Sequence, residues 1–166
     1  MNRYKVCVIG LGNVGFNLAV IFSKKYQTIG FDNDKKLIKK INKKAKLNCA
    51  TDKKSKLIIT NDYKLIIDSN VYIITVPTPV DNKKKPDLGS ILDVTRLVSK
   101  FIKKGNIIIY ESTFYPGLTE EVCIPLIENK SNLKINKDFF VGYSPERINI
   151  GENEKMSQDI IKITSG

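Results

Sequence analysis

The chain has 166 residues, 42% of them hydrophobic, and this length and hydrophobic content are enough for one domain with a buried core. Its formal net charge is +11. It has no histidine and three widely separated cysteines, which excludes a Ser-His-Asp or Cys-His mechanism, a His-ligated metal site and a disulfide or zinc framework for this chain. No apolar run approaches the roughly 20 residues that span a bilayer, and the chain enters its first apolar segment without a signal peptide, so we expect a cytoplasmic protein.

The positive charge comes almost entirely from lysine. Lysines and arginines together number 28 against 17 acidic residues, and the only arginines are Arg3, Arg96 and Arg147. The lysines are spread along the chain among asparagines and isoleucines, without a recognised nucleic-acid motif, so the pattern favours solvated lysine faces. A basic module that binds nucleic acid or another partner through its charge is the alternative.

The first predicted elements are a strand, a glycine turn, a helix and a second strand. A short apolar strand, residues 5–9, ends in glycines with the spacing G-x-G-x-x-G: Gly10, Gly12 and Gly15. Residues 16–25 have helical spacing, residues 28–31 form the next strand, and Asp32 follows it directly. This order of elements is the fingerprint of a dinucleotide-binding fold.

Each part of this motif has a physical role. Gly10 permits the tight turn, Gly12 has no Cβ so that a pyrophosphate can approach, and Gly15 lets the helix pack close to the strand. The helix start offers free N–H groups and a positive dipole end to the phosphates. Asp32 can accept both ribose hydroxyls and would repel a 2′-phosphate, which favours NAD over NADP. The alternative is a glycine-rich turn in an unrelated α/β protein.

The rest of the chain alternates predicted strands and helices. The further strands are residues 57–60, 71–76, 106–110, 139–143 and 160–166. The further helices begin at Asp34 and Asp62, which are possible caps, after Leu88, and at Thr119, from which a helix runs to about Ile127; residues 43–56 and 129–137 are predicted loops. This alternation predicts a Rossmann-type α/β fold, a doubly wound and mostly parallel sheet with helices on both faces, as a single domain of residues 1–166.

Two buried strands end in segments that carry hydroxyl groups and prolines. Pro77-Thr78-Pro79 follows the strand of residues 71–76, and residues 111–119 follow the strand of residues 106–110. The carboxyl ends of parallel strands meet at one edge of a sheet, so we expect both segments to lie near the glycine turn. A rigid Pro-Thr-Pro corner suits packing against a cofactor, and a plain turn at a strand end is the alternative.

Three stretches behind the glycine motif carry a resemblance to a known family: residues 74–79, 111–119 and 142–149. In this order the chain resembles the UDP-glucose/GDP-mannose dehydrogenase family, and within it the bacterial branch that oxidises UDP-N-acetylhexosamines at C6. The residues that match the family's NAD site are Gly10, Gly12, Asn13, Val14, Gly15, Asp32, Val76, Pro77, Thr78, Ser112 and Thr113.

The resemblance also implies catalytic and substrate residues. Glu146 would act with the Thr113 hydroxyl, through a water, in proton transfer or hydrolysis. The segment that would approach the sugar nucleotide is Glu146, Arg147, Ile148 and Asn149. The alternatives without the family match are that Arg147 is a surface ion-pair partner and that Thr113 provides a turn hydroxyl.

The resemblance implies an activity that extends beyond this chain. The family oxidises the C6 hydroxyl of a UDP-sugar to a carboxylate with two NAD, here for surface polysaccharide precursors, as a homodimer without metal, nucleic-acid or membrane partners. Its nucleophilic cysteine and UDP-sugar domain lie in a continuation that this chain lacks, so the chain resembles the N-terminal domain alone, and a truncated inactive module is the alternative.

Cys123 follows Thr119 in a helix and is expected in the core. Leu37 stands where many relatives have a basic residue.

Overall fold

A six-stranded sheet forms the middle layer of the molecule, in the order β3-β2-β1-β4-β5-β6. This computed structural model describes residues 4–48, 56–80, 85–113, 115–145 and 164–166. The strands are β1 (Lys5–Ile9), β2 (Gln27–Phe31), β3 (Leu57–Thr60), β4 (Val71–Ile74), β5 (Ile107–Tyr110) and β6 (Phe140–Tyr143). All neighbouring strands are parallel, which confirms the predicted Rossmann-type sheet.

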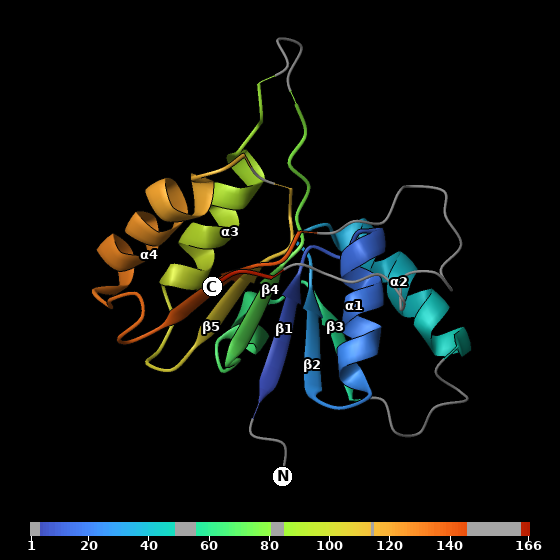
Figure 1. Ribbon diagram of the computed structural model, residues 1–166. Coiled ribbons are helices and arrows are strands. Elements are labelled where there is room, and N and C mark those ends of the chain that lie inside the picture. Colours follow the sequence, from blue (N-terminus) through green and yellow to red (C-terminus); the bar gives the residue numbers. More distant parts are fainter. Residues whose placement is uncertain (1–3, 49–55, 81–84, 114, 146–163) are drawn as a thin grey trace.

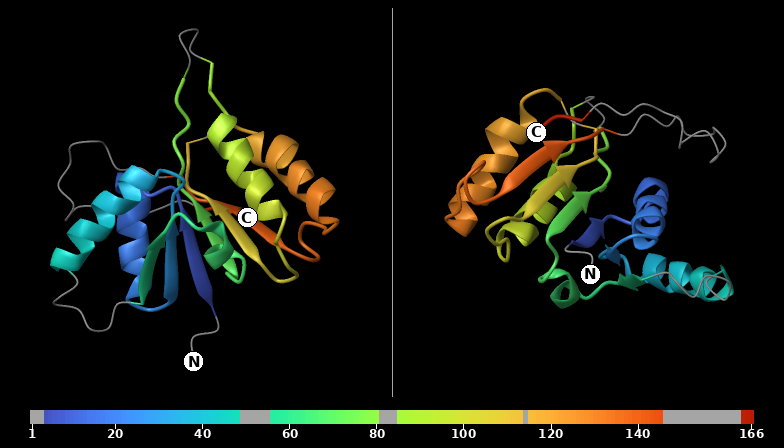
Figure 2. Two further views of the ribbon diagram at one scale, coloured as in Figure 1. Left: turned by 180° about the vertical axis from the view of Figure 1, so that it is seen from behind. Right: turned by 60° about the horizontal axis from the view of Figure 1, so that its bottom comes forward.

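Helices cover both faces of this sheet (Figure 1). The helices α1 (Asn13–Ser23) and α2 (Lys35–Asn48) lie on one side, and α3 (Gly89–Ser99) and α4 (Ile124–Ser131) lie on the other. Two short elements complete the described fold: a 3₁₀ turn, η1 (Tyr63–Ile66), and a π-helical turn, η2 (Thr119–Cys123), which leads into α4. The two further views show the same three layers (Figure 2).

Side chains of the strands alternate between two apolar cores. On the α3 and α4 side, the buried strand residues are Cys7, Ile9, Ile29, Phe31, Tyr72, Ile74, Ile108, Tyr110 and Val141. On the α1 and α2 side they are Val6, Val8 and Ile73. Each fully buried isoleucine or leucine stabilises the fold by about 1.5–3 kcal/mol, so the two cores hold the strands in register.

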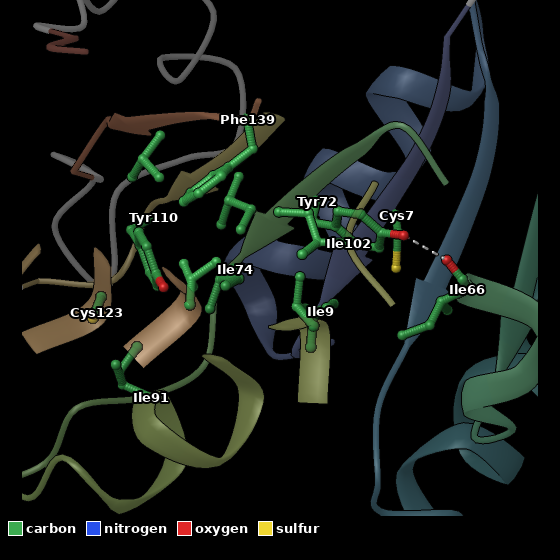
Figure 3. Packing of buried hydrophobic residues seen from close by; sticks show 14 of the residues in the cluster. Cys7, Ile9, Ile66, Tyr72, Ile74, Ile91, Ile102, Tyr110, Cys123 and Phe139 are labelled. Atoms are coloured by element: carbon green, nitrogen blue, oxygen red, sulfur yellow. Dashed lines mark hydrogen bonds between the residues drawn. The ribbon is translucent and has the colours of Figure 1, made fainter. Parts of the chain in front are cut away.

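Two buried tyrosines keep their hydroxyl groups hydrogen-bonded inside the larger core, and the bond from Tyr72 to Ile66 is drawn in Figure 3. Tyr72 donates to the carbonyl oxygen of Ile66 at 3.1 Å. The Tyr110 hydroxyl lies 2.8 Å from the hydroxyl of Thr95 on α3. Both tyrosines therefore fill the core without leaving the hydroxyl unsatisfied.

Both predicted caps are confirmed. The Asp34 carboxylate accepts hydrogen bonds from the backbone N–H groups of Lys36 at 2.7 Å and Leu37 at 3.2 Å, so it caps α2. The Asp62 carboxylate accepts from the backbone N–H of Lys64 at 2.9 Å and caps η1. A short acidic side chain before a helical stretch was a sufficient signal in both places.

Several helix boundaries differ from the prediction, including the ends of α1 at Ser23 and of α3 at Ser99, which come before the predicted ends at residue 25 and Gly105. Helix α1 begins at Asn13, inside the glycine motif, rather than at residue 16. Helix α2 continues to Asn48 into the predicted loop, because lysine, alanine and leucine favour helix and no glycine or proline interrupts residues 43–48. Helix α4 likewise continues to Ser131 and ends where Asn132 adopts a left-handed conformation, with φ 59°.

The strand predicted at residues 160–166 is not found as a strand among the residues described. Residues 160–163 of that prediction lie outside the described ranges. Ser165 forms one antiparallel bridge with Tyr143, through two backbone hydrogen bonds of 2.7 and 2.9 Å. The described end of the chain therefore pairs with the outer edge of β6.

Candidate functional site

An open pocket of about 650 Å³ lies at the carboxyl ends of the central strands. Its walls come from the glycine turn, the loop after β2, the segment after β4 and one side of α3. The lining residues are Ile9, Gly10, Gly12, Asn13, Val14, Phe31, Asp32, Asn33, Asp34, Leu37, Thr75, Val76, Pro77, Ser90, Asp93, Val94 and Leu97. The pocket lies between β1 and β4, where the strand order reverses, which is the usual ligand site of an open α/β sheet.

The three glycines differ in what surrounds them. Gly10 has φ +94°, and a Cβ there would lie 2.9 Å from the backbone nitrogen of Val76. A Cβ on Gly15 would collide with the carbonyl oxygen of Gly10 and the hydroxyl of Thr75. Gly12 is exposed, and a Cβ there would meet nothing within 4 Å. Gly10 and Gly15 are therefore needed by the fold, while Gly12 presents open backbone to the pocket.

The N-terminus of α1 forms one wall of the pocket. Gly12 is the N-cap residue, in an extended conformation, and Asn13 and Val14 begin the helix. The first N–H groups of a helix have no partner within it, and the first turn of α1 contains no acidic side chain. This wall therefore has the N–H groups and the dipole that bind phosphate.

The Asp32 carboxylate is held in place by backbone N–H groups. One oxygen accepts from the N–H of Leu11 at 2.7 Å, and the other accepts from the N–H of Asp34 at 2.9 Å. The side chain is half-buried and lines the pocket. Each carboxylate oxygen has a second lone-pair site, so the group can still accept the two hydroxyls of a ribose.

The segments after β4 and β5 are joined by two hydrogen bonds. The buried Ser112 hydroxyl donates to the carbonyl oxygen of Val76 at 2.6 Å. The Thr78 hydroxyl donates to the carbonyl oxygen of Thr113 at 2.8 Å, and the Thr113 side chain is exposed. Val76 and Pro77 line the pocket, so these bonds hold the Ser112–Thr113 segment next to it.

The structure thus brings most of the predicted site residues to one edge of the sheet. The glycine turn, Asp32, Val76 and Pro77 line the pocket. The remaining predicted cofactor residues lie next to it: Ser112 is hydrogen-bonded to Val76, and Thr78 is hydrogen-bonded to Thr113. The four predicted substrate residues, Glu146, Arg147, Ile148 and Asn149, lie outside the described residues.

Sequence reasoning missed several contributors to the pocket, among them Thr75 and one side of α3. Thr75 lines it and contacts the glycine turn. The α3 residues at the wall are Ser90, Asp93, Val94 and Leu97. Their spacing of i, i+3, i+4 and i+7 places them on one side of a helix, but such spacing does not by itself distinguish a pocket wall from a core face.

The described cysteines take no part in the pocket. Cys7 and Cys123 are both fully buried, which confirms the core position predicted for Cys123. Burial raises the pKa of both thiols, so they stay protonated and unreactive in the folded chain. Across the described ranges, no three His, Cys, Asp or Glu side chains come close enough to hold a metal ion. None of the helices in this part of the chain combines the length and the hydrophobicity that a membrane-spanning segment needs.

Fold and pocket together define a Rossmann-type dinucleotide-binding domain, because the glycine turn, the helix N-terminus and the carboxylate after β2 converge on one cleft. Residues 4–163 match the model of the NAD-binding domain of the UDP-glucose/GDP-mannose dehydrogenase family. The chain belongs to this family, and it is the NAD-binding domain.

Curated relatives cover the whole chain. It is 46% identical to the UDP-N-acetyl-D-glucosamine 6-dehydrogenase of Pseudomonas aeruginosa and 42% identical to that of Salmonella typhi, in each case over 100% of this chain and 40% of the relative. The chain therefore spans about 40% of the length of the relatives it matches.

Solved structures agree with the fold. The UDP-D-ManNAc dehydrogenase of Pyrococcus horikoshii has a TM-score of 0.81 at 31% identity, over 92% of this chain and 38% of that one. A ternary complex of the GDP-mannose dehydrogenase of Pseudomonas aeruginosa has a TM-score of 0.79 at 31% identity, over 93% of this chain and 38% of that one. Both share the domain described above.

Proposed function

We propose that residues 1–166 form the NAD-binding domain of a dehydrogenase that oxidises the C6 hydroxyl of a UDP-N-acetylhexosamine to a carboxylate with two NAD. The substrate class is supported by the relatives named as UDP-N-acetyl-D-glucosamine 6-dehydrogenases, which align with the entire chain. The same proposal assigns the reaction to surface polysaccharide precursor synthesis in the cytoplasm and a homodimer to the full-length enzyme.

One observation carries the cofactor assignment: the Asp32 carboxylate is held by backbone N–H groups at the edge of the pocket that the glycine turn forms. A negative charge there attracts ribose hydroxyls and repels a 2′-phosphate. Gly12, with open space where a Cβ would stand, fits the pyrophosphate of NAD. The residues present therefore fit NAD and disfavour NADP.

The remaining residues take roles around the dinucleotide. The N–H groups of Asn13 and Val14 would hold the pyrophosphate, and Val76 and Pro77 would form a wall beside the adenosine. When bound, NAD supplies a hydride acceptor. The Ser112–Thr113 segment, tied to Val76 and Thr78, would orient the nicotinamide end.

The proton-transfer roles follow the family resemblance. Glu146 would move a proton through a water, together with the exposed Thr113 hydroxyl, at the substrate oxygen. Arg147, Ile148 and Asn149 would contact the sugar nucleotide. An ordered arrangement of such groups is what makes the oxidation fast.

Calorimetric titration of the purified chain with NAD and with NADP, at two salt concentrations, tests the cofactor proposal. We expect saturable NAD binding, weaker NADP binding and little dependence on salt, because a fixed carboxylate and backbone N–H groups carry the recognition. Absence of NAD binding, together with salt-sensitive binding of DNA or RNA, would instead favour a basic module that acts through the net charge of +11.

A further inference from the structure

The hydroxyl of Thr75, which directly follows β4, contacts the glycine turn. Its oxygen lies 2.7 Å from the carbonyl oxygen of Gly10 and 3.0 Å from that of Ile9. The backbone N–H of Thr75 already donates to the Ile9 carbonyl at 2.8 Å. The hydroxyl proton is therefore available for the nearer acceptor, Gly10.

Three groups meet at this point. Gly15 on α1 packs so closely here that a Cβ would collide with both the Gly10 carbonyl oxygen and the Thr75 hydroxyl. Gly10 has φ +94°, a conformation in which its carbonyl group can be turned toward β4 and α1. The Gly10 carbonyl oxygen is thus directed at Thr75 and Gly15.

The direction of this carbonyl matters for an anion. A carbonyl oxygen carries partial negative charge and repels phosphate, whereas the N–H groups at the start of α1 attract it. A turn that exposed the Gly10 carbonyl to the pocket would therefore oppose phosphate binding there. A hydroxyl donor that holds the carbonyl elsewhere removes this repulsion.

We propose that Thr75 is a positioning residue for the pyrophosphate: its hydroxyl holds the Gly10 carbonyl away from the phosphates and keeps the N–H groups of the turn directed at them. This inference rests on the proposed NAD-binding function. It assigns a role in cofactor binding to a side chain that lies at the end of β4, outside the glycine motif itself.

The test compares Thr75→Val, which keeps the branched shape and loses the donor, with Thr75→Ser, which keeps the donor. Affinities of the 166-residue chain are measured for NAD, ADP and adenosine by calorimetry or NMR titration. Loss of one hydrogen bond predicts that T75V binds NAD and ADP about five- to tenfold more weakly. We expect adenosine, which has no phosphate, to bind T75V as it binds the wild type, and T75S to bind all three normally.

Thr95→Val is the matched structural control. Thr95 is a buried threonine whose hydroxyl lies 2.8 Å from that of Tyr110 in the core, away from the pocket. T95V should lower the melting temperature without changing the ratio of ADP to adenosine affinity. If T75V does not fold, Thr75→Ala against T75S gives the same comparison.

Three results would overturn the inference. An equal loss of affinity for all three ligands would mean that Thr75 only supports the fold. Unchanged ADP and NAD affinities in T75V would remove the role of the hydroxyl and leave the proposed function intact. A wild-type chain that binds no NAD would overturn the proposed function itself and this inference with it.

Discussion

At the scale of single residues, the pocket depends on side chains that are already held before a ligand arrives. Asp32 has one backbone N–H on each oxygen, at 2.7 and 2.9 Å, so its orientation is fixed by the glycine turn and by the loop after β2. Preorganised groups bind ligands better because less conformational entropy is lost on binding. The carboxylate can therefore act both as a structural link and as a ribose acceptor.

Asp32→Ala should weaken NAD binding about 10- to 100-fold, because it removes hydrogen bonds to a charged acceptor. The preference for NAD over NADP should also relax, since the charge that repels a 2′-phosphate is gone. Calorimetric affinities for both cofactors check this. Asp68→Ala is the control, because Asp68 forms an exposed ion pair with Lys103 and does not line the pocket. Equal cofactor affinities before and after D32A would refute the ribose assignment.

At the scale of elements, helix starts decide where polar backbone groups point. Helix α1 starts at Asn13, within the glycine motif, no side chain caps it, and Asn13 and Val14 of its first turn line the pocket. Helix α2 starts beside the same pocket but is capped by Asp34, which satisfies two of its N–H groups. The two helix starts thus differ: the first N–H groups of α1 have no side-chain cap, whereas the Asp34 carboxylate caps α2.

Asp34→Ala should lower the free energy of unfolding by about 1 kcal/mol through loss of the α2 cap. Chemical denaturation of the purified chain measures this change. The matched control is Asp93→Ala, which removes the same carboxylate from the surface of α3, where it pairs with Arg96 at 2.9 Å. An exposed pair of this kind contributes less than about 1 kcal/mol, so D93A should have a smaller effect. A loss in D93A as large as that in D34A would contradict the capping role.

At the scale of the whole molecule, the strand order makes the site. Because the strand order reverses between β1 and β4, the glycine turn after β1 and the segment after β4 lie together at one edge of the sheet and both line the pocket. Helix α3, which follows β4 in the chain, lines one side of this pocket. The pocket is lined from four parts of the fold, the glycine turn, the loop after β2, the segment after β4 and α3, while the relatives extend well beyond the part that this chain matches.

The 166-residue chain should therefore bind NAD and yet produce no NADH from UDP-N-acetylglucosamine. The chain spans about 40% of its relatives, and a reaction of this kind needs oriented groups on both sides of the substrate. Cys7 and Cys123 are buried and protonated, so neither offers a nucleophile in the folded domain. NADH absorbance under single-turnover conditions is the measurement. Formation of NADH by the pure chain would contradict this prediction.

The sequence by itself determined the elements that depend on local rules. The glycine turn and the acidic residue after β2 could be predicted because a positive φ, a close helix approach and a strand end each restrict the residue type locally. The caps Asp34 and Asp62 could be predicted for the same reason. Helix ends were harder to predict, because lysine-rich segments such as residues 43–48 are compatible with both helix and loop.

Only the tertiary structure decided which distant segments touch. The Thr75 hydroxyl meets Gly10 across 65 positions of sequence, and Ser112 meets Val76 across 36. The pocket face of α3 is likewise set by the sheet on which the helix packs. No periodicity or propensity encodes such pairs, because each depends on the order in which parallel strands lie side by side.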